Sequence, residues 1–357
     1  MTAAELRRKG IHIAVGHFAL LLRWLTWPQA ILMALAACLF NWRVLPAIGG
    51  RGLWREREHG AGYALGILLY PLSVLALILV FRHHLWMAAG VWGVLAWGDG
   101  MASIAGSALG GPRLPWNTDK GWTGSAAFVL FGALGAAVFM AWTLRLPLGG
   151  WLSPRVLGLA VPLALLCALV ESLPTTLDDN VTVPLTGAVA LPLLALAAPS
   201  LLLADADLPR RALMGLGVNA AIALLAWKAR SIDLGGALSA VVIGTAVTAA
   251  LGLAGLAVLV AFFVIGTAAT RLGYRVKAAR GIAQEKGGAR GWRNAWANGG
   301  VPAALALMAA MVPESLAGFF TLAYAAAVAT AAADTCSSEI GKAYGRRTFL
   351  ITTLRPV

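Results

Sequence analysis

Long apolar blocks alternate with short polar segments along the whole chain. Residues 126–142, 182–203 and 251–270 carry no charged side chain at all. A helix needs roughly 20 apolar residues to cross the hydrocarbon core of a bilayer, and a backbone surrounded by lipid must pair its polar groups within the segment. The pattern therefore predicts about twelve membrane-spanning helices. We expect them at residues 11–27, 28–42, 61–81, 85–104, 123–144, 156–172, 182–203, 211–227, 236–250, 252–270, 297–312 and 316–333.

The composition excludes a soluble protein. Of the 357 residues, 60% are hydrophobic and only 12% are charged, whereas a soluble domain carries about 25% charged residues. The three cysteines, Cys38, Cys167 and Cys336, lack metal-type spacing and are interpreted as small apolar residues. The fold class that follows is all-α, a polytopic integral membrane protein.

The formal net charge of +13 gives the expected orientation. In a membrane protein, Lys and Arg gather in the cytoplasmic segments. With the N-terminus inside, most of the basic residues fall on the cytoplasmic side, including seven between Arg271 and Arg293. We therefore expect a multi-pass protein of the inner or plasma membrane of a prokaryote, with the N-terminus and the active face cytoplasmic, in contact with membrane lipid. A nucleic-acid partner is not expected.

The few acidic residues lie in polar islands on the expected cytoplasmic side. Carboxylates bind Mg²⁺, glycine-rich backbone and helix starts bind anions, and a lysine offsets the charge of a transferring phosphoryl group. The islands therefore suit a nucleoside triphosphate. Their members are Gly98, Asp99, Gly100, Ser103 and Gly106, then Lys120, Gly124 and Ser125, then Glu171, Asp178, Asp179 and Asn180.

Three alternatives to a phosphate site remain open at this point. Asp99 can cap a helix, Lys120 can be an ordinary cytoplasmic basic residue, and residues 178–180 can form a turn. The sequence contains no G-x-x-x-x-G-K-[ST] motif, which excludes a P-loop enzyme.

The second half of the chain repeats the spacing of the first island. Asp99, Ser103, Gly106 and Gly110 form D-x3-S-x2-G-x3-G, and the same spacing returns at Asp334, Ser338, Gly341 and Gly345. The offset carries Lys120 onto Arg355. We expect two related halves, residues 1–204 and 211–357, each with a phosphate-type site. The second half is expected to continue beyond Val357.

Residues 5–200 resemble a known family. The segments ELRRKGIHIAVGH, GDGMASIAGS, DKGWTGS and ESLPTTLDDNVTVPL are similar to the phytol kinase and dolichol kinase family, which uses CTP to phosphorylate long isoprenoid alcohols. The resemblance implies a CTP–Mg²⁺ site lined by Asp99, Lys120, Gly124, Ser125, Glu171, Asp179 and Asn180. Gly100 departs from the threonine or serine of many relatives.

Residues 215–357 resemble a related membrane family that includes plant phytyl-phosphate kinase. The similarity lies in NAAIALLAWKARSIDLGGALSA, the basic segment around residues 271–293, and AADTCSSEIGKAYGRRTFLITTLRPV. It implies a second site at Lys277, Lys286, Gly288, Arg290, Asn298, Asp334, Ser338, Glu339 and Lys342. The basic segment, interpreted without the resemblance, can instead contact anionic lipid.

The expected function is CTP-dependent phosphorylation of a phytol- or geranylgeraniol-type alcohol, with Asp99, Lys120, Glu171 and Asp179 as catalytic residues. Mg²⁺ is expected on Asp99, Glu171 and Asp179, or one of these carboxylates acts as the base; His12 and His17 are weaker candidates. The second half is expected to act on the prenyl phosphate and to form the diphosphate. The alternatives are a cytidylyltransferase that makes a CDP-lipid and a transporter built from two repeats.

Overall fold

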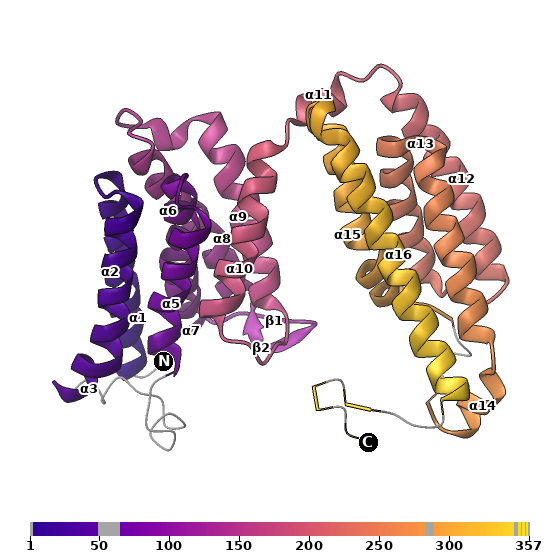
Figure 1. Ribbon diagram of the computed structural model, residues 1–357, viewed down its shortest axis with the longest axis horizontal. Coiled ribbons are helices and arrows are strands. Elements are labelled where there is room, and N and C mark those ends of the chain that lie inside the picture. The colour runs from indigo at the N-terminus through magenta and orange to yellow at the C-terminus, as the bar shows by residue number, and fades with distance from the viewer. Residues whose placement is uncertain are drawn as a thin grey trace. The chain divides into compact units, whose positions relative to one another are not determined.

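The computed structural model describes residues 3–48, 65–282, 289–345, 349–350, 352–353 and 355. Over these residues the protein is almost entirely helical, which confirms the all-α prediction (Figure 1). The chain divides into two compact units, Met1–Leu196 and Ala197–Val357, called unit 1 and unit 2. The assignment of a separate function to each half stays a prediction.

Unit 1 is a helical bundle with one short hairpin at one end. Its elements are α1 (Ala3–Gly16), η1 (His17–Arg23), α2 (Trp27–Leu39), η2 (Phe40–Val44), α3 (Leu45–Ala47), α5 (Leu65–Val80), α6 (Leu85–Gly93), η4 (Val94–Asp99), α7 (Gly100–Leu109), β1 (Arg113–Leu114), β2 (Asn117–Gly121), α8 (Trp122–Thr143), η5 (Gly150–Leu152), α9 (Pro154–Ser172) and α10 (Asp179–Leu196).

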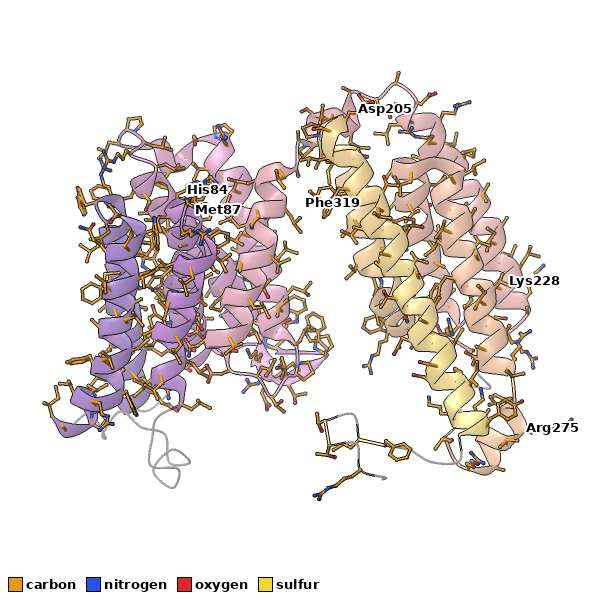
Figure 2. All side chains as sticks on the ribbon, in the orientation of Figure 1. His84, Met87, Asp205, Lys228, Arg275 and Phe319 are labelled. Carbon is orange, nitrogen blue, oxygen red and sulfur yellow. The ribbon has the colours of Figure 1, made fainter. Side chains whose placement is uncertain are left out.

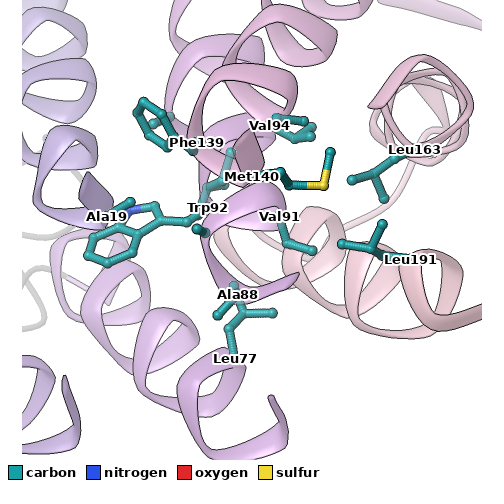
Figure 3. Close-up of a cluster of buried hydrophobic side chains, with 14 of the residues drawn as sticks. Ala19, Leu77, Ala88, Val91, Trp92, Val94, Phe139, Met140, Leu163 and Leu191 are labelled. Carbon is teal, nitrogen blue, oxygen red and sulfur yellow. The ribbon is translucent and has the colours of Figure 1, made fainter. Parts of the chain in front are cut away.

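The core of unit 1 combines large apolar side chains with glycine contacts between helices. Trp92, Met140 and Leu191 are nearly inaccessible members of one buried cluster, in which the Trp92 indole points toward Ala19 and Leu191 lies beside Val91 (Figure 3). A Cβ added at Gly93 would lie 2.5 Å from the carbonyl oxygen of Gly135. Small residues therefore allow α6 and α8 to approach closely, as in other membrane helix pairs.

The helical run over residues 85–109 carries the first polar island. Its middle, Val94–Asp99, is π-helical, a geometry that often marks functional sites. The run then leads into a hairpin in which Arg113 pairs with Gly121 and Leu114 pairs with Asn117. The predicted spans end at residue 104 and resume at residue 123, and the sequence pattern did not predict this hairpin between them. The hairpin lies at the same end of unit 1 as the start of α1 (Figure 1).

Unit 2 is a bundle of long helices. Its elements are α11 (Pro199–Leu203), α12 (Leu208–Lys228), α13 (Leu234–Arg271), α14 (Tyr274–Ala279), α15 (Trp292–Met311) and α16 (Glu314–Tyr344). Asp205 and Arg275 mark its opposite ends (Figure 2). Helix α13 breaks at Gly252, whose φ of 66° and ψ of −160° are non-helical. This break separates the two spans that the sequence predicts on either side of it.

Seven helices among the described residues are long and apolar enough to cross a membrane. Many apolar side chains also face outward, including Leu130, which is 65% exposed, and Phe319, which is 66% exposed (Figure 2). The membrane prediction is confirmed, but the count of twelve spans is not. The span expected at 182–203 ends earlier: α10 stops at Leu196, and Pro199 starts the separate helix α11, since a proline disfavours helical geometry in the residue before it.

Candidate functional site

A lysine from α1 holds the aspartate of the first island. Lys9 Nζ donates to Asp99 Oδ1 at 3.0 Å and to Oδ2 at 2.8 Å. His12 follows Lys9 by three residues, so the two side chains share one face of the helix. Its Nε2 lies 3.0 Å from the carbonyl oxygen of Leu95 and 3.5 Å from Asp99 Oδ2. Asp99 is 5% exposed, so this carboxylate is buried and paired.

The hairpin presents Lys120 to the carboxylates of two further helices. Lys120 Nζ donates to the side chain and to the backbone carbonyl of Glu171 at the end of α9, and it lies 3.7 Å from Asp179 Oδ1 at the start of α10. The hairpin is fastened to α9 because Asn117 Nδ2 donates to the carbonyl oxygen of Ser172 at 3.0 Å. The predicted group of Lys120, Glu171 and Asp179 is therefore brought together.

Asn180 connects this cluster to α5. Its Nδ2 donates to Asp178 Oδ1 at 2.8 Å, and its carbonyl oxygen accepts a hydrogen bond from Ser73. Its Oδ1 is buried and has no hydrogen-bond partner among the described residues. A buried acceptor without a partner is uncommon in native proteins, and a hydroxyl or a water can satisfy it. Asn180 thus offers an acceptor toward a ligand.

Several of these polar groups open onto a cavity in unit 1, called the main cavity, whereas Lys120 and Glu171 do not line it. The cavity has a volume of about 560 Å³ and is lined by Lys9, His12, Asp99, Asp179 and Asn180 together with many apolar side chains. Sites for small organic ligands commonly measure about 300–1,000 Å³. The cavity can therefore hold a substrate with an apolar body and one polar end.

The predicted phosphate-binding glycines lie in helix contacts. A Cβ at Gly100 would lie 2.4 Å from Ile13 Cγ1, and one at Gly98 would lie 3.2 Å from the Phe128 ring. Gly106 faces Gly124: a Cβ added at Gly106 would lie 3.4 Å from the Cα atom of Gly124. The contact with Ile13 explains why residue 100 lacks a side chain. A role for these glycines in binding nucleotide stays a prediction.

The remaining nucleotide-binding candidates lie close to these glycines. Ser103 is on α7 and Ser125 is in the first turn of α8. Both side chains are partly buried, and the two helices are in contact. The start of α8 follows Lys120 by two residues, and helix starts present backbone N–H groups to anions.

The three expected magnesium ligands do not form one cluster. Among the described residues, no group of three His, Cys, Asp or Glu side chains is arranged to hold a metal ion. Lys9 pairs with Asp99 and Lys120 pairs with Glu171, whereas Asp179 has a side chain that is 42% exposed. The residues therefore do not fit a magnesium site built by the protein alone. Mg²⁺ held by one carboxylate and by phosphate oxygens stays a prediction.

Unit 2 contains a more deeply buried ion pair. Lys277 is 1% exposed and donates to Glu339 Oε2 at 2.6 Å and to the carbonyl oxygen of Thr270 at 2.7 Å. Lys342 Nζ lies 3.6 Å from Glu339 Oε1. Three of the expected second-site residues therefore meet where α14 and α16 are in contact.

Arg290 joins this region from the segment before α15. Its guanidinium donates to the carbonyl oxygen of Gly266 at 2.9 Å and to Thr270 Oγ1 at 3.1 Å. Burial lowers the pKa of Arg290, and the nearby Glu339 carboxylate opposes that shift. Arg290 and Asn298 line a second cavity of about 110 Å³.

The other second-site candidates lie outside this cluster. Asp334 and Ser338 are exposed on α16, and Lys286 and Gly288 lie outside the described residues. The repeated spacing therefore places Asp334 in an environment unlike that of buried Asp99. The buried acid of this segment is Glu339, five residues later.

Sequence reasoning missed Lys9 as a site residue and ranked His12 low. The sequence did contain a signal for both residues, because a lysine and a histidine three residues apart share a helix face near the start of an apolar helix. The partner of Lys9 lies 90 residues away, a distance that helical periodicity does not bridge.

Comparisons with known proteins give the family. Residues 217–357 match the family described as integral membrane protein DUF92. An uncharacterized membrane protein of Synechocystis is 46% identical over 116 residues, which cover 32% of this chain and 45% of that protein. The farnesol kinase of Arabidopsis thaliana is 31% identical over 202 residues, or 52% of this chain and 64% of that protein. No solved structure matches the chain.

The phytol kinase of Synechocystis covers the largest part of this chain among these relatives. It is 31% identical over 199 residues, which make up 53% of this chain and 78% of that protein. The match covers a smaller part of the other relatives, 64% of the Arabidopsis farnesol kinase and 45% of the Synechocystis membrane protein. The 78% coverage at 31% identity shows that this chain belongs to the prenol kinase family that includes the Synechocystis phytol kinase.

Proposed function

We propose that the protein phosphorylates a long-chain isoprenoid alcohol of the phytol or geranylgeraniol type, with CTP as the phosphate donor. The observation that carries the proposal is the polar end of the 560 Å³ cavity, where Lys9, His12, Asp99, Asp179 and Asn180 meet an apolar wall. An alcohol with a long apolar chain matches both parts of this cavity. The names of the phytol kinase and farnesol kinase relatives support the same substrate class.

In the proposed reaction the carboxylates of Asp99, Glu171 and Asp179 have different roles. The alcohol oxygen attacks the γ-phosphorus of CTP, the bond to the bridging oxygen breaks, and CDP leaves. Asp99 and Glu171 are each held by a lysine, whereas Asp179 is more exposed and faces the cavity. Asp179 therefore accepts the hydroxyl proton in our proposal, since a base must reach the proton that it removes.

Lys120 offsets the charge of the transferring phosphoryl group in this proposal. It stands between Glu171 and Asp179 and immediately before the first turn of α8. Phosphoryl transfer depends mostly on positioning and electrostatic stabilisation. A triphosphate adds negative charge to a site with three carboxylates, which favours a bound Mg²⁺ that supplies further positive charge. The cytoplasmic position of this end and the prokaryotic membrane are part of the same proposal.

We propose that unit 2 adds a second phosphate to the prenyl phosphate. Three cationic side chains, Lys277, Arg290 and Lys342, lie around Glu339, and Arg290 also lines the 110 Å³ cavity. Cations favour an anionic substrate over a neutral alcohol. Arg290→Ala should reduce diphosphate formation from geranylgeranyl phosphate and leave monophosphate formation unchanged. Loss of both activities would argue against a separate second site.

The test of the first reaction uses purified protein in detergent with phytol or geranylgeraniol and each of the four nucleoside triphosphates. We expect prenyl monophosphate, with CTP as the best donor. Lys120→Ala and Asp179→Asn should each abolish it, whereas Lys228→Ala, an exposed change in unit 2, should not. A CDP-lipid with released pyrophosphate would instead identify a cytidylyltransferase. Solute uptake into vesicles without any phosphorylated product would identify a transporter.

A further inference from the structure

Three helical segments of unit 1 form a trough that makes up much of the main cavity. Its members recur every three or four residues on each helix, which is the spacing of one helix face. The wall residues are Lys9, His12, Val15 and Phe18 from α1 and η1, then Met33, Ala34, Ala36, Ala37 and Asn41 from α2 and η2, then Gly66, Ile67, Tyr70, Pro71 and Val74 from α5. We call this surface the tail trough.

The tail trough has a polar end and an apolar end. Asn41 Nδ2 donates to the carbonyl oxygen of Ile67 at 3.0 Å, so α2 and α5 meet at the level of Asn180, whose Nδ2 reaches the neighbouring carbonyl of Gly66. Figure 1 shows α3, the hairpin and the start of α1 at this same end of unit 1. Beyond Lys9, His12 and Asn41 the wall is apolar apart from the Tyr70 hydroxyl, which accepts a hydrogen bond from Trp92.

Helix geometry gives the length of the trough. Along η2 and α2 the wall runs eight residue steps from Asn41 to Met33, and along α5 eight residue steps from Gly66 to Val74. At 1.5 Å per residue both walls are about 12 Å long. This is less than half of the hydrocarbon core, which is about 30 Å thick. The trough is therefore too short to enclose a long isoprenoid chain completely.

The apolar end is open to the outside of the unit. Phe18 is 53% exposed, and Ala36 on the α2 wall is exposed as well. The small side chains of Ala36 and Ala37 leave room for a branched chain, and the thioether of Met33 adapts to irregular shapes. A chain that fills the trough can leave it sideways into lipid.

We propose that the tail trough binds the part of the isoprenoid chain next to the hydroxyl, while the rest of the chain lies in lipid. This inference rests on the proposed function. It implies that the enzyme selects its alcohol substrates by the shape of the chain next to the hydroxyl, and not by the total chain length. The occupant is an isoprenoid alcohol because the polar end offers hydrogen-bonding groups to one hydroxyl and the remaining wall is apolar.

The kinetic test narrows the trough with Ala37→Phe. Leu35→Phe is the matched control, because Leu35 lies on the same helix, is 41% exposed and does not line the cavity. The substrates are dimethylallyl alcohol, farnesol and geranylgeraniol. Wild type should use farnesol and geranylgeraniol about equally. Ala37→Phe should lower kcat/KM for geranylgeraniol relative to dimethylallyl alcohol by about 10- to 200-fold, and Leu35→Phe should leave this ratio unchanged.

An unchanged ratio in folded Ala37→Phe would overturn the tail trough and leave the kinase function standing. If this variant does not fold, Val15→Phe narrows the same trough from α1 and replaces it. Binding is tested without turnover by a geranylgeraniol analogue that carries a diazirine near the hydroxyl end. Crosslinks should fall on peptides that contain Ala37 or Ile67, which lie next to the polar end. Crosslinks confined to other helices would overturn the inference, and the absence of any phosphorylated alcohol in wild type would overturn the proposed function.

Discussion

The ion pair between Lys9 and Asp99 gives the sharpest prediction on stability. Their side chains are 15% and 7% exposed, and the shorter of the two contacts is 2.8 Å. Lys9→Met leaves the carboxylate buried, with His12 at 3.5 Å as its remaining ion-pair partner among the described residues. Removing one partner of a buried pair costs about 3–5 kcal/mol. Since Lys9 is partly exposed and His12 remains, we expect about 3 kcal/mol.

Substitution of the other partner of the ion pair should reduce the free energy of unfolding by less. Asp99→Asn leaves Lys9, whose long side chain can turn toward the cavity, so we expect about 1–2 kcal/mol. The double variant should cost at least about 1 kcal/mol less than the sum of the two single variants, because the residues are in contact. About 3 kcal/mol corresponds to a fall in Tm of about 6–12 °C for a unit of this size.

The assay is thermal unfolding of purified protein in one detergent, followed by circular dichroism of the helices. Wild type, both single variants and the double variant are compared at the same pH and ionic strength. Costs that simply add in the double variant would show that Lys9 and Asp99 do not interact in the folded protein, and the site built on this pair would be wrong.

Three further changes test other parts of the structure. Lys277→Met removes the cation from the buried pair in unit 2, so the Tm should fall by an amount equivalent to about 3–5 kcal/mol, while prenyl monophosphate formation should persist. Gly100→Ser places a side chain against Ile13 and should lower the Tm by an amount equivalent to about 1–3 kcal/mol. Adding Ile13→Ala should recover most of this loss. Tyr324→Phe removes the hydrogen bond of 2.6 Å from the buried hydroxyl to the carbonyl oxygen of Gly255. It should lower the Tm by an amount equivalent to about 1–3 kcal/mol, and an unchanged Tm would contradict that contact.

Apolar run length predicted the helices because it reports the thickness of the membrane. It did not predict where helices bend or stop within an apolar run. Residues 182–203 contain no charge, yet the chain breaks before Pro199, where the N–H of Ala198 donates to the carbonyl oxygen of Met311 at 2.6 Å. That contact comes from a helix more than one hundred residues later, and no local pattern encodes it.

The candidate site, too, was predicted from the sequence only in part. Lys120, Glu171 and Asp179 were expected together and lie together, because each follows or ends an apolar span on one side of the bundle. The glycines were expected around phosphate, but Gly98 and Gly100 contact neighbouring helices. Glycine serves both purposes, and only the position of the opposing helix tells them apart.

The central claim is that the γ-phosphoryl group of CTP passes to an isoprenoid alcohol. The most direct measurement gives the purified protein geranylgeraniol and CTP labelled at either the α- or the γ-phosphorus. We expect the γ-label to enter the lipid and the α-label to remain in CDP, and we expect Lys120→Ala to abolish the transfer. An α-label in the lipid, or no label in any lipid product, would contradict the central claim.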